Sequence, residues 1–455
     1  MRIRARSTSR PAAGMLARMS AASDPLARLI AERRFAEAEA LCRARLQTDP
    51  ADAAALGALL PQLMGRGELL QARVLAESAV KADGGHRDLL LMLGQVRARM
   101  RDFASARSAF AEAAALNQGD WIALLFLADS AQATGDAEAA LSARVQALLR
   151  AEREGALAPQ ARLPAQLQTQ LQRAIAIVQE ARALHLDAAL APLRQDRDAR
   201  TLVRVDAALD ALVGRTARAQ SHPLQHPTLL CVPDLQPRPW FDRDAFPELF
   251  EALAGIERSA DEIRQELLAL LDDEDGVEPY IDMPERAPAA PIWRELNRSP
   301  RWRTYHFHRH GAEITAHRAR CPRTAAALDA LPLIRIPDHA PEAMFSLLAP
   351  NTAIPAHTGV MNGRLTVHLP LIVPANCGAL KVGGEARGWE EGRCIVFDDS
   401  FVHEAWNHSE RLRAVLIFDL WHPQLAEIER AYLTSLITAL GEFNRRHGAD
   451  DEASA

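Results

Sequence analysis

The sequence predicts an α+β protein of more than one domain, in which an α-helical repeat region precedes a β-rich domain. Three observations support this prediction. Alanine- and leucine-rich segments recur at a fixed interval in the first third of the chain, a proline-rich stretch follows at 221–239, and short apolar segments of alternating polarity dominate from Trp302 onward. At about 100–200 residues per domain, a chain of 455 residues has room for two or three domains.

The composition is that of a globular protein. Hydrophobic residues make up 48% of the chain and charged residues 25%, which excludes wholesale disorder, collagen and coiled coil. A net charge of −6 gives no sign of a nucleic-acid partner. No run of apolar residues is long enough for a membrane span. Almost all basic residues are arginine, which is typical of G+C-rich bacterial coding.

The cysteines and the termini predict a cytoplasmic protein. The 5 cysteines are scattered without a CxxC pair, so we expect buried reduced thiols and neither a disulfide framework nor a zinc knuckle. Residues 1–23 carry several arginines but lack the apolar segment of a secretory signal, and we expect a disordered leader there. A disordered tail is expected at 447–455.

A repeat of 34 residues spans 24–150. Three features share its register: a small alanine that opens a helix, a turn, and an apolar pair in the intervening helix. The alanines are Ala38, Ala72, Ala106 and Ala140, the turns are Asp49-Pro50, Asp83-Gly84 and Asn117-Gln118, and the pairs are Leu56/Leu59, Leu90/Leu93 and Leu124/Leu127. This pattern resembles a tetratricopeptide (TPR) array, a helical solenoid. A generic alanine-rich bundle is the alternative, and the shared register favours the repeat.

Residues 151–220 predict a helical connector, and 221–446 the β-rich domain. The connector has helical periodicity at Gln166–Leu184 and Arg200–Val213, and prolines between 221 and 239 mark the boundary. In the second domain, helices are expected at Asp244–Asp272 and Gln424–Phe443. Strands are expected at Trp302–His308, Met344–Leu348, Leu365–Val373, Arg393–Phe397 and Leu412–Leu420. Many short strands predict a β-sandwich or barrel.

Candidate chemistry gathers on these strands. His357 lies at a bend between Pro355 and Gly359, and His403 follows a strand among acidic and aromatic residues. In 364–373, leucine and valine alternate with a second set that includes Arg364 and His368, so that a cation and an imidazole face one way. Arg413 begins another buried strand.

Two histidines with arginines and a hydroxyl suit a non-haem iron site with a bound dicarboxylate. Neutral imidazoles bind Fe(II) and leave positions open for a bidentate 2-oxo acid and then O₂. Arginine matches the distal carboxylate. On spacing alone, hydrogen-bonded structural histidines remain the alternative.

Residues 235–426 resemble the aspartyl/asparaginyl β-hydroxylase domain. The resemblance rests on Arg238-Pro-Trp-Phe-Asp242, Arg320-Cys-Pro-Arg-Thr324, Phe345-Ser346, His357-Thr-Gly359, His368-Leu369, Trp389-Glu-Glu-Gly392, Phe397-Asp-Asp-Ser-Phe401 with His403-Glu404, and Asp419-Leu-Trp-His-Pro423. It implies a double-stranded β-helix (jelly-roll or cupin-like) oxygenase that uses Fe(II) and 2-oxoglutarate. TPR-like repeats before this domain are also familiar from family members.

The resemblance also implies roles for individual residues. His357 and His403 would bind the iron without a protein carboxylate, since Gly359 occupies the position of the usual third ligand. Ser346 and Arg413 would hold the distal carboxylate of 2-oxoglutarate, with His368 near its chelating end. This chain departs from its relatives at Val360-Met361, at Thr366 in place of an arginine, and at Pro370 in place of a glycine. Arg364, on the same face as Thr366, is expected to compensate in part.

The function implied is hydroxylation of an unactivated C–H bond, with release of succinate and CO₂. The β-carbon of an aspartyl or asparaginyl residue is the expected target, in a peptide or protein held by the TPR-like groove. The departures lie on the substrate side and leave this specificity open. The alternatives are a lipid acyl-chain hydroxylase of the same family and an inactive scaffold protein.

Other polar residues predict structural roles. Three alternating histidines, at 306, 308 and 310, allow a zinc site but fit an ordinary strand equally well. We expect Asp398 and Asp399 to cap a turn, Glu404 to have a structural or indirect role, and His422 to pack in a turn. Gly383-Gly384 predicts a hairpin, because no helix follows it as in a phosphate loop.

Overall fold

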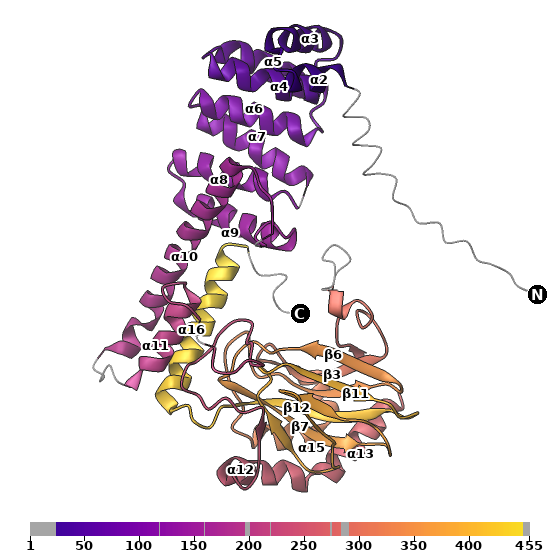
Figure 1. The fold of residues 1–455 in the computed structure, drawn as a ribbon. Helices are drawn as coiled ribbons and strands as arrows, with labels where there is room; N and C mark the ends of the chain where they lie inside the picture. Colours follow the sequence, from indigo (N-terminus) through magenta and orange to yellow (C-terminus); the bar gives the residue numbers. More distant parts are fainter. Residues whose placement is uncertain are drawn as a thin grey trace, which may run out of the picture. The chain divides into compact units, whose positions relative to one another are not determined.

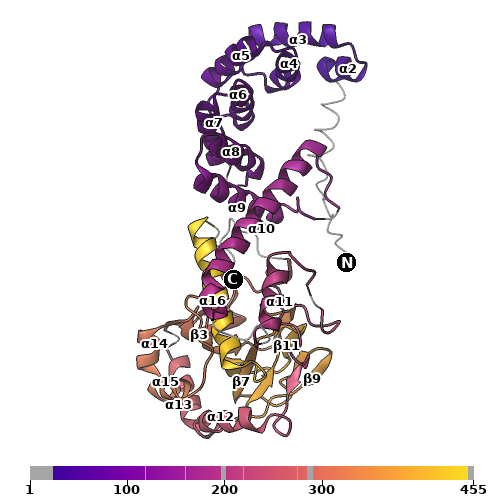
Figure 2. The same ribbon diagram turned by 90° about the vertical axis from the view of Figure 1, so that its left-hand side faces the viewer.

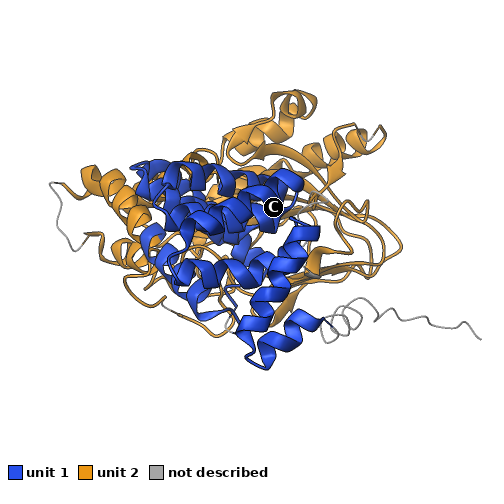
Figure 3. Ribbon diagram, turned by 90° about the horizontal axis from the view of Figure 1, so that it is seen from above, with its two compact units in different colours: residues 1–178 blue, residues 179–455 orange. Residues whose placement is uncertain are grey.

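The computed structural model describes residues 24–117, 119–158, 160–195, 201–218, 220–273, 275–283 and 291–448. The predicted leader and all but the first two residues of the predicted tail lie outside the described residues. The chain divides into two compact units, residues 1–178 and 179–455 (Figure 3), and the division falls within the predicted connector. In the described part of the chain, no helix combines the length and the apolar character needed to cross a bilayer.

The first unit consists of helices that pack on one another in sequence (Figure 2). They are α2 (Pro25–Ala31), α3 (Phe35–Thr48), α4 (Ala53–Gly65), α5 (Leu69–Ala82), α6 (Arg87–Arg99), α7 (Phe103–Leu116), α8 (Trp121–Ala133) and α9 (Ala137–Arg153), and α10 (Ala165–Arg194) continues into the second unit. The four alanines of the repeat, on α3, α5, α7 and α9, are all 0% exposed. An aspartate before α4, α7, α8 and α9 accepts a backbone hydrogen bond and caps the helix.

Close helix packing in this unit predicts a contrast between two glycines. A Cβ at Gly94 on α6 would overlap the ring of Phe110 on α7, whereas a Cβ at Gly65 on α4 would meet nothing within 4 Å. We expect Gly94→Ala to lower the free energy of unfolding by about 1–3 kcal/mol through overpacking. Gly65→Ala is the matched control and is expected to be neutral or stabilising by up to about 1 kcal/mol. Urea denaturation measures both, and equal effects would contradict the prediction.

The second unit contains the predicted mixture of helices and short strands. Its helices are α11 (Val203–Leu212), α12 (Pro247–Arg258), α13 (Ala260–Leu271), the 3₁₀ turn η2 (Pro291–Trp293), α14 (Thr315–Arg320), α15 (Pro322–Asp329) and α16 (Glu427–Arg446). Its strands are β1 (Trp240–Phe241), β2 (Glu278–Pro279), β3 (Trp302–Arg309), β4 (Ala312–Glu313), β5 (Ala343–Leu348), β6 (Thr352–His357), β7 (Arg364–Ile372), β8 (Leu380–Val382), β9 (Glu385–Arg387), β10 (Ile395–Phe397), β11 (His403–Asn407) and β12 (Arg413–Trp421). An α+β chain with an N-terminal helical region and an antiparallel sheet domain is thereby confirmed.

The strands form two antiparallel sheets. The larger has the order β1-β10-β7-β12-β5-β3-β2, with β4 beside β3, and the smaller has the order β6-β11-β8-β9. Helices α12, α13 and α15 cover the outer face of the larger sheet (Figure 1), where a core cluster joins them to the sheet. A second cluster combines side chains of both sheets, including Ile354 and Val382 from the smaller and Leu348 and Val415 from the larger. Jelly-roll domains have this general form, with two sheets around one core.

Strand β7 confirms the alternation predicted for 364–373 as far as Leu371. Its four apolar residues, Leu365, Val367, Leu369 and Leu371, belong to the core under the helices. The intervening residues therefore face the smaller sheet. The alternation ends before Val373, because the register between β7 and β12 shifts at Ala414 and Val415. Val373 consequently packs against the cluster between the sheets and not with the four residues predicted to share its face.

Candidate functional site

The two candidate metal ligands lie opposite each other on the smaller sheet. His357 ends β6, His403 begins β11, and the two residues are paired in register. Their ring centroids are 4.0 Å apart. Nδ1 of His357 lies 2.8 Å from the carbonyl oxygen of Pro355, and Nδ1 of His403 lies 2.9 Å from that of Phe401. A carbonyl can only accept, so each Nδ1 carries the hydrogen and each Nε2 keeps its lone pair.

Burial keeps both rings neutral. It lowers the pKa of His357 to about 4, and it also lowers the pKa of His403. The rings of His357 and Trp293 of η2 make a T-shaped contact, with ring centroids 5.0 Å apart and planes at 70°, which further restrains the histidine ring. Neutral imidazoles with oriented, free Nε2 atoms meet the requirement for metal ligands.

Within the part of the chain that the structure describes, no third ligand accompanies the histidine pair. In the described ranges, no group of three or more His, Cys, Asp or Glu side chains is arranged to hold a metal ion. Gly359 has no space for a side chain, because a Cβ there would overlap the carboxylate of Asp399. The amide of Gly359 donates to the Asp399 carbonyl at 2.6 Å, which fixes this close approach. Two imidazoles that leave most positions open fit Fe(II), which binds oxygen ligands from a cosubstrate.

Arg413 is a buried cation that has no carboxylate partner among the described residues. It begins β12, is 1% exposed, and its Nε and Nη1 atoms have no hydrogen-bond partner. The guanidinium lies 4.8 Å from the ring centroid of Trp389, and burial lowers the pKa of Arg413 to about 10. An unpaired buried charge is costly, so this arrangement favours an anionic ligand.

Ser346 and His368 lie on the same face of the larger sheet as Arg413. Ser346 pairs with Val415, two residues along β12 from Arg413, and His368 pairs with Ile417. Trp302 Nε1 donates to Ser346 Oγ at 3.1 Å, so the hydroxyl hydrogen remains available to a ligand. Nδ1 of His368 has no partner, and burial lowers the pKa of His368 well below its usual range. The structure thus brings together the three residues expected to hold a dicarboxylate.

Arg364 lies between two carboxylates that its place in the sequence did not predict. Its Nη2 donates to Asp399 Oδ2 at 2.7 Å, and its Nη1 lies 3.5 Å from Asp419 Oδ2. Burial raises the pKa of Asp419 to about 6 and that of Asp398 to about 7. Asp419 alternates with the apolar residues of β12 that pack under the helices. This alternation indicates that its carboxylate faces the smaller sheet, and it could have been recognised in the sequence. Asp398 and Asp399 were both predicted to cap a turn. Asp398 does so, because it accepts from the amide and hydroxyl of Ser400. The carboxylate of Asp399 accepts from Arg364.

The other polar candidates have structural contacts. Glu404 pairs with Lys381 at 2.9 Å, and His422, 1% exposed, packs against Phe241. Gly383 and Gly384 connect β8 and β9 as the predicted hairpin. On β3 a register shift between His306 and His308 interrupts the alternation that a three-histidine site requires. All five cysteines are buried and unpaired.

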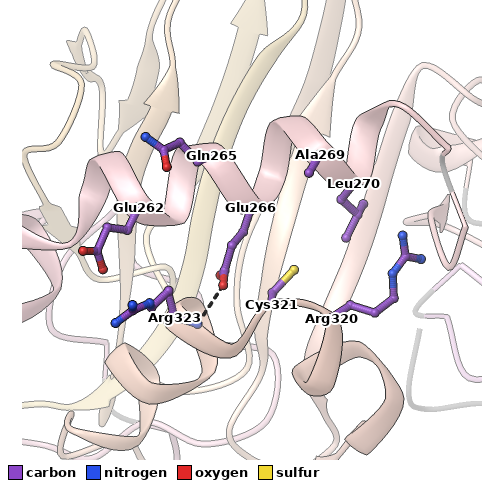
Figure 4. A pocket seen from close by; sticks show the side chains of 8 residues that line it. All are labelled: Glu262, Gln265, Glu266, Ala269, Leu270, Arg320, Cys321 and Arg323. Atoms are coloured by element: carbon purple, nitrogen blue, oxygen red, sulfur yellow. Dashed lines mark hydrogen bonds between the residues drawn. The ribbon is translucent and has the colours of Figure 1, made fainter.

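Two surface cavities lie away from the histidine pair. One, of about 410 Å³, lies between α13 and residues 320–323 (Figure 4). Glu266 on its wall accepts from the amides of Arg323 and Thr324 and so caps α15. The other, of about 470 Å³, borders β1 and β10. Neither cavity is lined by a predicted site residue.

Buried histidines predict acid sensitivity of the metal-free protein. Burial lowers the pKa of six histidines, namely His306, His308, His357, His368, His403 and His422, and raises the pKa of two carboxylates, Asp398 and Asp419. Below pH about 6.5 the unfolded chain binds protons at histidines that stay neutral in the folded protein. The free energy of unfolding therefore decreases as the pH is lowered. The two carboxylates act in the opposite direction but are outnumbered.

We therefore expect the free energy of unfolding to decrease between pH 7 and pH 5, as measured by urea denaturation. Burial lowers the pKa of His422 to about 4, and at 1.36 kcal/mol per pH unit this residue alone accounts for about 2 kcal/mol of the decrease. His422→Gln should flatten the profile by that amount. An unchanged profile in this variant would contradict the prediction.

Comparison with known proteins identifies a family and several relatives. The profile of the aspartyl/asparaginyl beta-hydroxylase family matches residues 257–423, a range that contains every predicted site residue. Aspartate beta-hydroxylase domain-containing protein 2 of Xenopus tropicalis is 34% identical over 218 residues, which cover 47% of this chain and 55% of the relative. This chain thus spans little more than half the length of that relative.

Two further relatives carry different names. Ornithine lipid ester-linked acyl 2-hydroxylase of Rhizobium tropici is 32% identical over 187 residues, or 41% of this chain and 61% of the relative. Human aspartyl/asparaginyl beta-hydroxylase is 29% identical over 211 residues, or 46% of this chain and 26% of the relative.

Proposed function

Because the chain belongs to the aspartyl/asparaginyl β-hydroxylase family through residues 257–423, we propose that it is an Fe(II)- and 2-oxoglutarate-dependent dioxygenase. It hydroxylates an unactivated C–H bond and converts 2-oxoglutarate and O₂ into succinate and CO₂. One observation carries the proposal: a pair of neutral histidines in register lies in the same two-sheet domain as a buried arginine with no anion of its own.

Each predicted residue has a role in this proposal. His357 and His403 hold Fe(II) through Nε2, and the bound iron supplies activation of O₂. Arg413 and the Ser346 hydroxyl bind the distal carboxylate of 2-oxoglutarate. His368 lies toward the chelating end, and its burial excludes water from that side. Arg364, which contacts Asp399 and Asp419, orients either the chelating end of 2-oxoglutarate or the substrate.

The proposed target is the β-carbon of an aspartyl or asparaginyl residue in a peptide or protein. A lipid acyl chain is the second candidate, since a relative at 32% identity is named as an ornithine-lipid acyl hydroxylase. A scaffold protein without activity is the third. The presence of His357, His403, Arg413 and Ser346 argues against it, and Thr366 in place of an arginine argues for it.

The domain organisation belongs to the same proposal. Residues 24–150 act as a TPR-like solenoid whose groove holds the substrate, and residues 221–446 are a double-stranded β-helix. Buried alanines at the 34-residue interval support the first assignment, and two antiparallel sheets around one cluster support the second. Unpaired cysteines favour a reducing cytoplasm.

The proposal can be tested without knowledge of the substrate. Anaerobic addition of Fe(II) and 2-oxoglutarate should produce a visible metal-to-ligand charge-transfer band. His357→Ala and Arg413→Ala should abolish the band, and His408→Ala, an exposed histidine on the same segment as His403, should retain it. Absence of the band in folded protein would overturn the proposed chemistry.

A further inference from the structure

Arg364 and Asp399 share a single hydrogen bond and leave one atom each without a partner. The bond joins Nη2 to Oδ2 at 2.7 Å, while Arg364 Nε and Asp399 Oδ1 are buried and unpaired. The side chains are 17% and 10% exposed. A buried donor and a buried acceptor without partners are costly, and together they favour a ligand that offers one acceptor and one donor.

This pair lies beside the histidines. The Asp399 carboxylate fills the space where a side chain of residue 359 would lie, two residues after His357, and Asp399 is four residues before His403. Arg364 begins β7 on the face that also carries Thr366 and His368. Thr366 is 8% exposed and pairs with Asp419 on β12. A substrate that reaches the histidine pair therefore meets these side chains.

Negative charge exceeds positive charge in this cluster. Two carboxylates, Asp399 and Asp419, lie within 4 Å of the single guanidinium of Arg364, and Arg413 belongs to the dicarboxylate site of the proposed function. The raised pKa of Asp419, caused first by burial, shows that further negative charge is unfavourable there. A substrate carboxylate would add a third negative group.

We propose that the side chain oxidised by this protein carries a primary carboxamide, as in asparagine, and that Arg364 and Asp399 select it against a carboxylate. The amide oxygen accepts from Arg364 Nε–H, and the amide NH₂ donates to Asp399 Oδ1. A carboxylate offers two acceptors and would set an oxygen against Asp399 Oδ1. This inference rests on the proposed function, in which the C–H bond beside the amide becomes C–OH while 2-oxoglutarate and O₂ become succinate and CO₂.

Two matched peptide libraries test the inference. Both have randomised flanks, and the central residue is asparagine in one and aspartate in the other. With Fe(II), 2-oxoglutarate and O₂, mass spectrometry should detect the gain of one oxygen at asparagine at least about tenfold more often than at aspartate. Capture of peptides by the metal-free full-length protein is measured separately and should show the same preference. Equal or greater selection of aspartate, or selection of neither, would overturn the inference.

Variants identify the residues responsible. Asp399→Asn removes the negative charge of the carboxylate whose Oδ1 has no partner. Thr366→Arg adds a positive charge on the same face of β7. Each variant should therefore shift the preference toward aspartate. Asp398→Asn is the matched control, because Asp398 is occupied by Ser400 and Gln225 and should leave the preference unchanged. If Asp399→Asn fails to fold, Thr366→Arg still decides.

Failure of the inference can be separated from failure of the proposed function. If the charge-transfer band forms but aspartate is preferred, only the substrate assignment is wrong. If the band does not form, the proposed chemistry is wrong, and peptide capture by the metal-free protein still tests selection of the amide.

Discussion

Replacing Arg413 with methionine is expected to abolish 2-oxoglutarate binding and at the same time to stabilise the ligand-free protein. Arg413 is 1% exposed, two nitrogens of its guanidinium have no hydrogen-bond partner, and the group lies 4.8 Å from the ring centroid of Trp389. Exchange of a buried charge for an apolar side chain of similar length commonly stabilises a fold by about 1–4 kcal/mol. Loss of the cation that binds a buried carboxylate costs about 2–5 kcal/mol of binding free energy.

Two measurements check this prediction. Urea denaturation of the metal-free protein should give a higher midpoint for Arg413→Met, and anaerobic titration with 2-oxoglutarate should give no charge-transfer band. Arg411→Met, an exposed arginine two residues earlier, is the control and should change neither quantity. If Arg413→Met destabilises the ligand-free protein, then the arginine has a structural partner and is not kept for a ligand.

Gly359→Ala is expected to disrupt the histidine pair. Its Cβ would overlap the Asp399 carboxylate, which cannot move freely because Arg364 holds it and because its backbone carbonyl accepts from the Gly359 amide. Overpacking of this kind costs about 1–3 kcal/mol. Since His357 is two residues away on the same strand end, the displacement should also weaken metal binding.

A double-mutant cycle separates overlap from other effects. Combining Gly359→Ala with Asp399→Ala removes the obstructing carboxylate, so the two changes together should cost less than the sum of each alone. Gly388→Ala, where a Cβ meets nothing within 4 Å, is the control. Full additivity in the cycle would show that Asp399 is not the obstacle.

Local pattern was sufficient to predict most elements of the fold. The 34-residue register predicted helices because each repeat buries its alanine against a neighbouring helix, and the alternation in β7 predicted its inner face. The helix expected at Asp244–Asp272 is instead two helices, α12 and α13, separated at Ser259. Strands β6 and β11 were not predicted, since they are short, only partly buried and lack a periodic signal.

The site required long-range information. The resemblance identified His357 and His403, but their pairing in register depends on strands β6 and β11, which are 46 residues apart at these positions and have no local signature. The Arg364–Asp399 pair was missed for the same reason, because it joins the start of β7 to the turn after β10. Alternation shows which face a side chain occupies, but it does not show which partner lies on that face.

The candidate ligands are divided between the two sheets, with the histidines on the smaller and Arg413, Ser346 and His368 on the larger. In the proposed function, the distance from the metal to the residues that bind the cosubstrate therefore equals a spacing between the two sheets. The apolar cluster of Ile354, Leu348, Val415 and their neighbours sets that spacing. Changes of side-chain volume in the cluster would alter the distance between the proposed metal and cosubstrate sites without changing any candidate ligand. Substrate range in such a scaffold can diverge through the thickness of its core as readily as through its active-site residues.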